Sequence, residues 1–219
     1  MTSTRAYCHI CHYPLKTCLC AFVTPVSSNH QIIILQHPSE VAQAKGTARL
    51  VDLAMSQARI VVGETAEDFA ALVAELFPLY PNESHNKAEA RPCAKPCYLV
   101  YPQASSQNVE TLGARRAGEV IPPSTLLFLD GSWKKAWKLL QLNPWLAQLP
   151  SLTFSEAGPT EYQIRKAPRK DSLSTIESVA YCLDHLDNTD TTGLIRLFKA
   201  MIDGQWRFMS KDVQGRYRS

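Results

Sequence analysis

The chain has 219 residues, a formal net charge of +3 and 45% hydrophobic residues, enough apolar material for one substantial domain or for a core domain with a small appendage. A charge this small does not by itself indicate nucleic-acid binding, so that inference must rest on where the basic residues lie. No run reaches the roughly 18 to 20 apolar residues of a membrane helix, and the first residues lack the apolar stretch of a secretory signal. We therefore expect a cytoplasmic protein without a membrane partner.

The first 27 residues are rich in cysteine and show no helix or strand periodicity. The thiols have the spacing Cys8-x2-Cys11-x6-Cys18-x-Cys20. Four thiolates this close in sequence can surround one tetrahedral Zn²⁺, and a segment with so little core would gain its fold from the metal. Free structural cysteines or a redox pair are the alternatives, although four exposed thiols would be prone to oxidation. The spacing therefore predicts a structural zinc module over residues 1–27.

Five short apolar runs predict strands in the rest of the chain, at residues 31–36, 58–65, 97–102, 125–130 and from Ser151 onward. Each run is continuously apolar, and helix-permissive stretches separate several of them. This pattern favours an α/β fold with a mainly parallel sheet and flanking helices. In such sheets ligands collect beyond the carboxyl ends of the strands.

Helical periodicity appears in four places. Residues 40–55 favour a helix with a break near Gly46, and residues 66–77 carry apolar side chains at helical spacing before Pro78. The C-terminal third predicts two helices. The first begins with the capping arrangement Ser174-x-x-Glu177. The second has an apolar face made of Leu194, Leu197, Phe198, Met201 and Ile202.

The stretch "LFLDGSW" leads an apolar strand straight into a helix. Asp130 ends the strand, and Gly131 permits a sharp turn and the close approach of a ligand. Ser132 suits the N-cap of a helix that starts near Trp133, whose free N–H groups would face the same crevice. For Asp130, a helix cap or an ion pair with a following lysine fits the sequence as well as catalysis does.

The helix after this junction carries Trp133, Trp137 and Leu140 at the spacing i, i+4, i+7. Apolar residues at this spacing more often pack in a core than form a binding surface. We therefore predict that Trp137 packs in the core, whereas Trp133 belongs to the junction.

Five sequence elements together resemble a known family. They are the four N-terminal cysteines, "LQHPSE" at 35–40, "LVYP" at 99–102, "FLDGSW" at 128–133 and "YQIRKAPRKDSLSTIES" at 162–178. The chain is similar to the DTW-domain proteins, the tRNA-uridine aminocarboxypropyltransferases, whose Asp-x-Thr/Ser-Trp motif matches Asp130 to Trp133. Each element is weak alone, but five in the same order are specific.

The resemblance implies a SPOUT-like catalytic domain over residues 28–219, with a trefoil-knotted C-terminal region. It also implies a reaction that moves the 3-amino-3-carboxypropyl group of S-adenosyl-L-methionine to N3 of a uridine in tRNA and releases methylthioadenosine. Asp130 is then the expected general base or the group that orients the uracil. An S-adenosylmethionine-dependent RNA methyltransferase and a non-catalytic zinc RNA-binding protein are the alternative functions.

The resemblance further implies a donor site at the strand ends and at the Leu-Ser-Thr element. The expected S-adenosylmethionine contacts are Leu99, Tyr101, Pro102, Leu129, Asp130, Gly131, Ser132, Trp133, Leu173, Ser174 and Thr175. Ser174 and Thr175 could equally serve only as helix caps. His37 and Glu40 follow a strand end and are expected to line the site, although a structural histidine fits as well.

A basic loop is expected to contact the phosphates of tRNA through Arg165, Lys166, Arg169 and Lys170. A solvated charge run is the alternative, but the neighbouring Tyr162 and the Leu-Ser-Thr element favour RNA. The sequence does not determine the oligomeric state, and a monomer is favoured.

Overall fold

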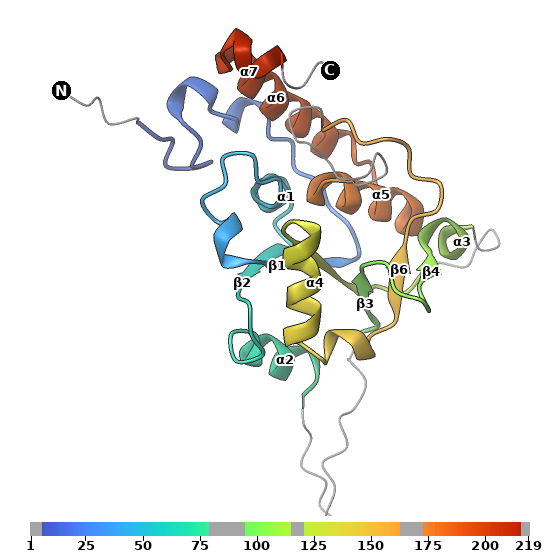
Figure 1. The fold of residues 1–219 in the computed structure, drawn as a ribbon. Helices are drawn as coiled ribbons and strands as arrows, with labels where there is room; N and C mark the ends of the chain where they lie inside the picture. The colour runs from blue at the N-terminus through green and yellow to red at the C-terminus, as the bar shows by residue number, and fades with distance from the viewer. Residues whose placement is uncertain (1–5, 79–94, 115–120, 163–172, 216–219) are drawn as a thin grey trace, which may run out of the picture.

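The computed structural model describes residues 6–78, 95–114, 121–162 and 173–215 (Figure 1). Six parallel strands form one sheet in the order β2-β1-β5-β3-β6-β4. Their bounds are β1 Gln31–Gln36, β2 Ala58–Val62, β3 Cys97–Val100, β4 Gln107–Asn108, β5 Thr125–Asp130 and β6 Ser151–Thr153. The predicted α/β class with a parallel sheet is confirmed.

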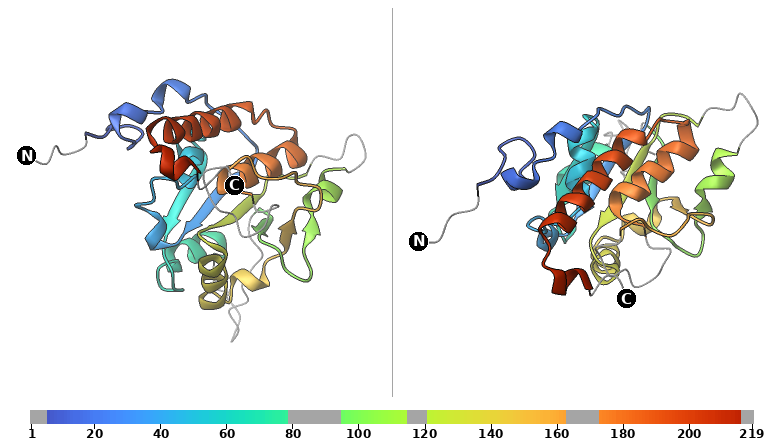
Figure 2. Two further views of the ribbon diagram at one scale, coloured as in Figure 1. Left: turned by 45° about the horizontal axis from the view of Figure 1, so that its top comes forward. Right: turned by 90° about the horizontal axis from the view of Figure 1, so that it is seen from above.

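Helices cover both faces of the sheet (Figure 2). One face carries α1 Ala48–Ala54, α5 Thr175–Asp187 and α6 Thr192–Phe208, and the other carries α2 Ala70–Leu76 and α4 Trp133–Leu142. The short helix α3 Val109–Gly113 packs on α5, and α7 Lys211–Gly215 follows α6. Four 3-10 turns complete the described elements: η1 Leu15–Thr17, η2 Cys20–Phe22, η3 Pro38–Glu40 and η4 Leu146–Gln148.

The central strand β1 shows why the strands are continuously apolar. Ile32 and Ile34 pack in the buried cluster with α1, α5 and α6, whereas Ile33 and Leu35 pack in the cluster with α2 and α4. Successive side chains of a strand point to opposite faces, so a sheet buried on both sides needs an apolar residue at every position.

Strands β1 and β5 are neighbours from which the chain departs in opposite directions. The connection after β1 runs through α1 to β2, and the connection after β5 runs through α4, on the other face, to β6. Such a topological switch point leaves a crevice beyond the carboxyl ends of the two strands, where open α/β sheets bind ligands. The register pairs Gln36 with Asp130 at this edge.

The cysteine-rich segment lies alongside α6, as both views of Figure 2 show. Cys11 and Leu19 belong to the same buried cluster as the inner face of α6. At Gly193 a Cβ atom would lie only 2.9 Å from Val26 Cγ2, so a glycine is needed for this close contact. The proposed division into residues 1–27 and 28–219 stays a prediction.

Helix α4 contradicts one expectation from the sequence. Trp137 is 56% exposed, and the residues that α4 buries are Ala136 and Leu139. The prediction that Trp137 packs in the core was wrong because helical spacing shows which residues share a face but not which face turns toward the sheet.

Three short elements, β4, α3 and α7, were not predicted because they span only two, five and five residues. The predicted apolar face of α6 is confirmed, since all five of its residues are buried. Residues 163–172 lie outside the described residues, so the knotted connection stays a prediction. No helix in the described part of the chain is long and apolar enough to cross a membrane.

Candidate functional site

Asp130 lies at the carboxyl end of β5 and is buried, with 6% of its surface exposed. Its Oδ2 accepts a hydrogen bond from Gln36 Nε2 at 2.8 Å, and its Oδ1 accepts one from the Thr175 hydroxyl at 2.6 Å. Gln36 is the register partner of Asp130, so both side chains leave the sheet on the same face. Neither Lys134 nor Lys135 forms an ion pair with Asp130 among the described residues, and Lys135 pairs with Glu40 at 2.6 Å.

His37 follows Gln36 and organises a polar network. Its Nε2 lies 2.8 Å from Glu64 Oε1, and Lys138 of α4 reaches the same oxygen at 2.6 Å. The Nδ1 atom accepts the Ser39 amide at 3.2 Å, which leaves Nε2 to donate to Glu64. Lys138, and then His37, hold the pKa of Glu64 below its ordinary value.

The junction after β5 is tight. The φ angle of Gly131 lies outside the left-handed region, but a Cβ atom there would lie 3.0 Å from Lys135 Cβ. Glycine is therefore needed for space and not for an unusual backbone angle. The Ser132 hydroxyl accepts the Lys135 amide at 3.4 Å, which confirms Ser132 as the N-cap of α4.

Two aromatic side chains meet beside this junction. The rings of Tyr101, just after β3, and Trp133 have centroids 5.9 Å apart at 54°. Burial raises the pKa of Tyr101. The strand ends of β3 and β5 thus bring together two of the expected donor contacts, one aromatic from each.

The start of α5 contacts Asp130 on the face of the sheet opposite to α4. The amide and hydroxyl of Ser174 donate to Glu177 Oε2 at 2.7 and 2.6 Å, within the predicted capping box. The hydroxyl of the next residue, Thr175, donates to Asp130. The two hydroxyls therefore have different partners: that of Ser174 starts the helix, and that of Thr175 ties the helix to the strand end.

Several expected donor contacts do not share this position. Leu99 is fully buried on the α4 side of the sheet, and Leu129 packs against the same cluster, so neither side chain joins the polar site around Asp130. Pro102 is exposed after β3. Leu173 lines a separate pocket, described next. The four basic residues expected to bind tRNA fall within 163–172 and lie outside the described residues.

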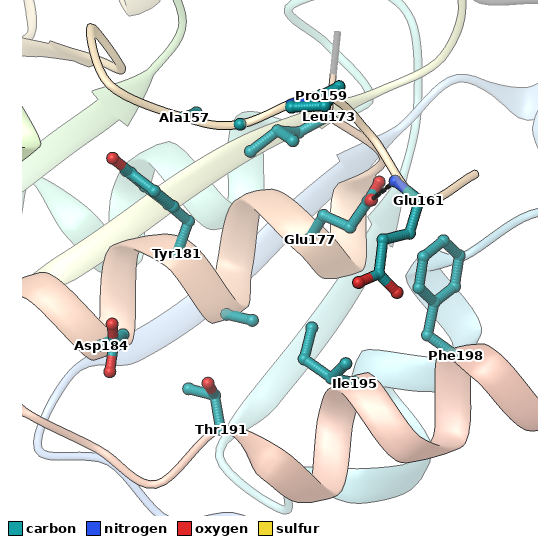
Figure 3. A pocket seen from close by; sticks show the side chains of 12 residues that line it. Ala157, Pro159, Glu161, Leu173, Glu177, Tyr181, Asp184, Thr191, Ile195 and Phe198 are labelled. Carbon is teal, nitrogen blue, oxygen red and sulfur yellow. Dashed lines mark hydrogen bonds between the residues drawn. The ribbon is translucent and has the colours of Figure 1, made fainter. Parts of the chain in front are cut away.

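A pocket of about 250 Å³ opens between α5, α6 and residues 157–161 (Figure 3). Its acidic members are Glu161, Glu177 and Asp184. Glu177 already accepts the Glu161 amide at 2.7 Å, and the Glu161 side chain pairs with Lys199 at 3.1 Å. Glu161 therefore has a cationic partner within the protein, and the Glu177 carboxylate is held by a backbone amide.

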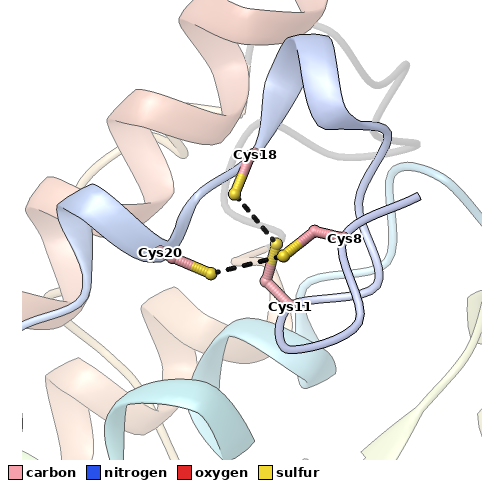
Figure 4. A group of neighbouring side chains, drawn as sticks. All are labelled: Cys8, Cys11, Cys18 and Cys20. Atoms are coloured by element: carbon pink, nitrogen blue, oxygen red, sulfur yellow. Dashed lines mark hydrogen bonds between the residues drawn. The ribbon is translucent and has the colours of Figure 1, made fainter. Parts of the chain in front are cut away.

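The four N-terminal thiols gather at one point (Figure 4). Their sulfur atoms all lie within 4.8 Å of one another, with Cys8 and Cys20 at 3.6 Å and Cys11 and Cys18 at 3.7 Å. Zinc–sulfur bonds of about 2.3 Å in a tetrahedron place sulfur atoms about 3.8 Å apart, so the spacing fits a Zn²⁺ ion. Four thiolates would fill its coordination sphere and leave no position for catalysis.

Local backbone structure forms this thiol cluster. His12 has a positive φ of 56°, and the turn brings the Cys8 amide within 2.8 Å of the Tyr13 carbonyl. Hydrogen bonds from the backbone amides of Cys11 and Ile10 lower the pKa of Cys8 to about 6. The low pKa of Cys8 favours the thiolate that binds metal, whereas burial and then the Cys8 thiol raise the pKa of Cys20 to about 12, so a bound metal must displace the Cys20 proton.

Sequence reasoning missed Gln36 and Glu64. Gln36 is the polar end of an apolar strand, a signal available in the sequence, but its partner became visible only with the strand register. Glu64 follows β2, and the neighbouring position of β1 and β2 brings it to His37.

The fold and the site define an α/β protein with a parallel sheet, a polar site at a topological switch point and a tetrathiolate cluster suited to a structural metal. The sequence matches the DTW domain family over residues 5–206, and the chain belongs to that family. The match contains both the thiol cluster and the Asp130 junction.

Relatives with a stated activity are distant. The chain is 29% identical to tRNA-uridine aminocarboxypropyltransferase 2 of Drosophila melanogaster over 187 residues. This aligned region covers 84% of this chain and 68% of the Drosophila protein. The chain is 25% identical to the protein of that name from Macaca fascicularis and 27% identical to that from Mus musculus, in each case over 85% of this chain and 58% of the relative. No solved structure matches.

Proposed function

We propose that this protein is a tRNA-uridine aminocarboxypropyltransferase. It transfers the 3-amino-3-carboxypropyl group of S-adenosyl-L-methionine to N3 of a uridine in tRNA and releases methylthioadenosine. The observation that carries the proposal is the family match over residues 5–206, which spans the whole candidate site. The relatives that are named for this activity support the same conclusion.

Asp130 serves this reaction as the base or as the group that orients the uracil. The bond from N3 to carbon forms while the carbon–sulfur bond breaks, and the N3 proton must go to an acceptor. A carboxylate offers about four lone-pair sites, and Gln36 and Thr175 occupy two of them. About two sites therefore remain for a uridine N–H, on a carboxylate already held in one orientation.

The donor binds at the strand ends of β3 and β5 and at the start of α5 in this proposal. Tyr101, Trp133 and Thr175 supply side chains, and the turn at Gly131 supplies backbone. Their task is to direct the aminocarboxypropyl arm, and not the methyl group, toward the nucleophile, because positioning decides which carbon on sulfur is attacked.

The remaining parts of the proposal concern the metal, the RNA and the compartment. Cys8, Cys11, Cys18 and Cys20 hold a structural Zn²⁺, for which their sulfur separations give support. The basic loop within 163–172 contacts the tRNA backbone. A monomer in the cytoplasm is the expected setting.

Mass spectrometry of nucleosides tests the function directly. Purified protein is incubated with unmodified tRNA and S-adenosylmethionine, and the tRNA is digested. Aminocarboxypropyl transfer adds about 101 Da to uridine, whereas methyl transfer would add about 14 Da. A uridine product heavier by the smaller mass would establish a methyltransferase, and unmodified uridine with intact tRNA binding would favour a non-catalytic RNA-binding protein.

A further inference from the structure

The outer side of α4 is unusual in what it exposes. Trp133 and Trp137 lie one turn apart and are 41% and 56% exposed. Lys134 and Lys138 lie beside them and are also exposed. We call these four residues the α4 platform. In Figure 1 α4 lies in front of the sheet.

Packing against the sheet does not account for Trp137, whereas Trp133 contacts the ring of Tyr101. The helix contacts the sheet through Ala136 and Leu139, so its core-facing side is already apolar without them. Trp137 has no ring partner among the residues that the structure describes. Neighbouring exposed indoles form an apolar patch of a kind that usually marks an interaction site.

The charge of α4 narrows the choice of partner. The helix carries three lysines and no acidic residue, and two of the lysines, Lys134 and Lys135, lie in its first turn. Positive side chains at that end oppose the helix dipole, whereas a bound phosphate would be favourable there. Lys135 and Lys138 are balanced by Glu40 and Glu64, but Lys134 has no ion-pair partner within the described ranges. The platform therefore complements an anionic partner.

The platform is continuous with the candidate active site. Trp133 lies three residues after Asp130, and its ring contacts Tyr101 at the end of β3. Exposed aromatic rings between lysines are the means by which proteins bind unpaired nucleotides, since every base has a face that can stack.

We propose that the α4 platform binds unpaired nucleotides of the RNA substrate that flank the target uridine. Trp137 stacks on a base, and Lys134 contacts a phosphate. The proposal rests on the proposed function, because the RNA is taken to be the substrate of the adjoining site.

Equilibrium binding of unmodified tRNA, without S-adenosylmethionine, tests the platform. Trp137→Ala should weaken tRNA binding by roughly five- to a hundredfold, whereas Trp137→Phe should retain most of the affinity because a ring remains. Lys134→Ala should reduce the slope of log K against log salt concentration by about 0.7 to 0.9. The matched control is Phe208→Ala, since Phe208 is also 56% exposed but lies on α6, across the sheet. This control should bind tRNA as the unmodified protein does.

The proposal that the platform binds RNA would be contradicted if Trp137→Ala bound tRNA with unchanged affinity. It would also be contradicted if Trp137→Ala lost affinity for phosphatidylserine vesicles but kept its affinity for tRNA. The binding assay also separates the two proposals. A protein whose tRNA affinity depends on Trp137 but which gives no modified uridine supports the platform and contradicts the transferase. A protein that modifies uridine and binds tRNA equally well with or without Trp137 supports the transferase and contradicts the platform.

Discussion

At the scale of single residues, Asp130 depends on partners distant in sequence. Gln36 and Thr175 lie 94 and 45 positions away and donate to different oxygens of one carboxylate. Two such donors restrict the side chain to one orientation. A carboxylate fixed in this way can act in a reaction without first losing conformational freedom.

Replacing Asp130 by asparagine separates chemistry from structure. Asparagine has nearly the same shape, but it is neither a base nor an anion, and rotation of the Gln36 amide and the Thr175 hydroxyl can satisfy its amide group. We expect the rate of uridine modification to fall by about 10²- to 10⁴-fold, with little change in the melting temperature. Single-turnover kinetics with saturating tRNA and donor would measure the fall.

The control for this substitution is Asp203→Asn, which changes an exposed carboxylate on α6. That variant should modify uridine at the normal rate. If Asp130→Asn did so as well, Asp130 would be neither base nor orienting group.

At the scale of elements, Glu110 joins three parts of the structure. It lies in α3, and its carboxylate accepts the amides of Ser155 and Glu156 at 2.9 and 3.0 Å and the hydroxyl of Tyr181 at 2.7 Å. Burial by itself would raise the pKa of Glu110, but these hydrogen bonds outweigh it and lower the pKa to about 2. One side chain therefore fixes α3 to α5 and to the segment after β6.

This carboxylate gives a prediction about acid stability. Because its pKa in the folded protein is below the ordinary 4.5, its contribution is complete above about pH 4.5 and is lost as the pH falls toward 2. Glu110→Gln should therefore lower the free energy of unfolding by about 1 to 2 kcal/mol at pH 7, and the difference from the unmodified protein should shrink below pH 4.5. Urea unfolding at several pH values measures both effects.

Glu75→Gln provides the comparison for Glu110→Gln. Glu75 pairs with Arg59 at 2.9 Å on the surface, where both side chains are more than 40% exposed. Its replacement should lower the free energy of unfolding by less than about 1 kcal/mol, both at pH 7 and below pH 4.5. Equal losses from the two substitutions would show that the hydrogen bonds of Glu110 add no more than a surface ion pair does.

At the scale of the whole molecule, the thiol cluster and α6 depend on each other. The cysteine-rich segment packs Leu19 and Val26 into the same buried cluster as α6, whereas Ile10 and Leu15 are exposed. Gly193 leaves space for this contact at Val26, where a Cβ atom would lie 2.9 Å from Cγ2. A metal that orders the segment should therefore also stabilise the domain beneath it.

Metal removal tests this dependence. Cys20→Ser should abolish stoichiometric zinc binding and lower the melting temperature by roughly 5 to 10 °C, because both the metal and the packing of the segment on α6 are weakened. Zinc analysis by mass spectrometry and thermal denaturation measure the two effects. In His9→Ala, which changes an exposed residue inside the same motif, both quantities should stay normal. A Cys20→Ser protein that melts at the normal temperature would show that the segment contributes nothing to the stability of the fold.

The sequence by itself determined the local features of this protein. It predicted five of the six strands, the Ser132 and Ser174 caps, the inner face of α6 and the four thiols, because hydrophobic periodicity, capping and ligand spacing are set by residues close together in the chain. The tertiary structure alone decided which strands are neighbours. That order placed the topological switch point between β1 and β5, gave Asp130 its partner Gln36 and joined Glu64 to His37. It also turned Trp137 outward, since the side of a helix that faces a sheet depends on the fit between surfaces that are far apart in the sequence.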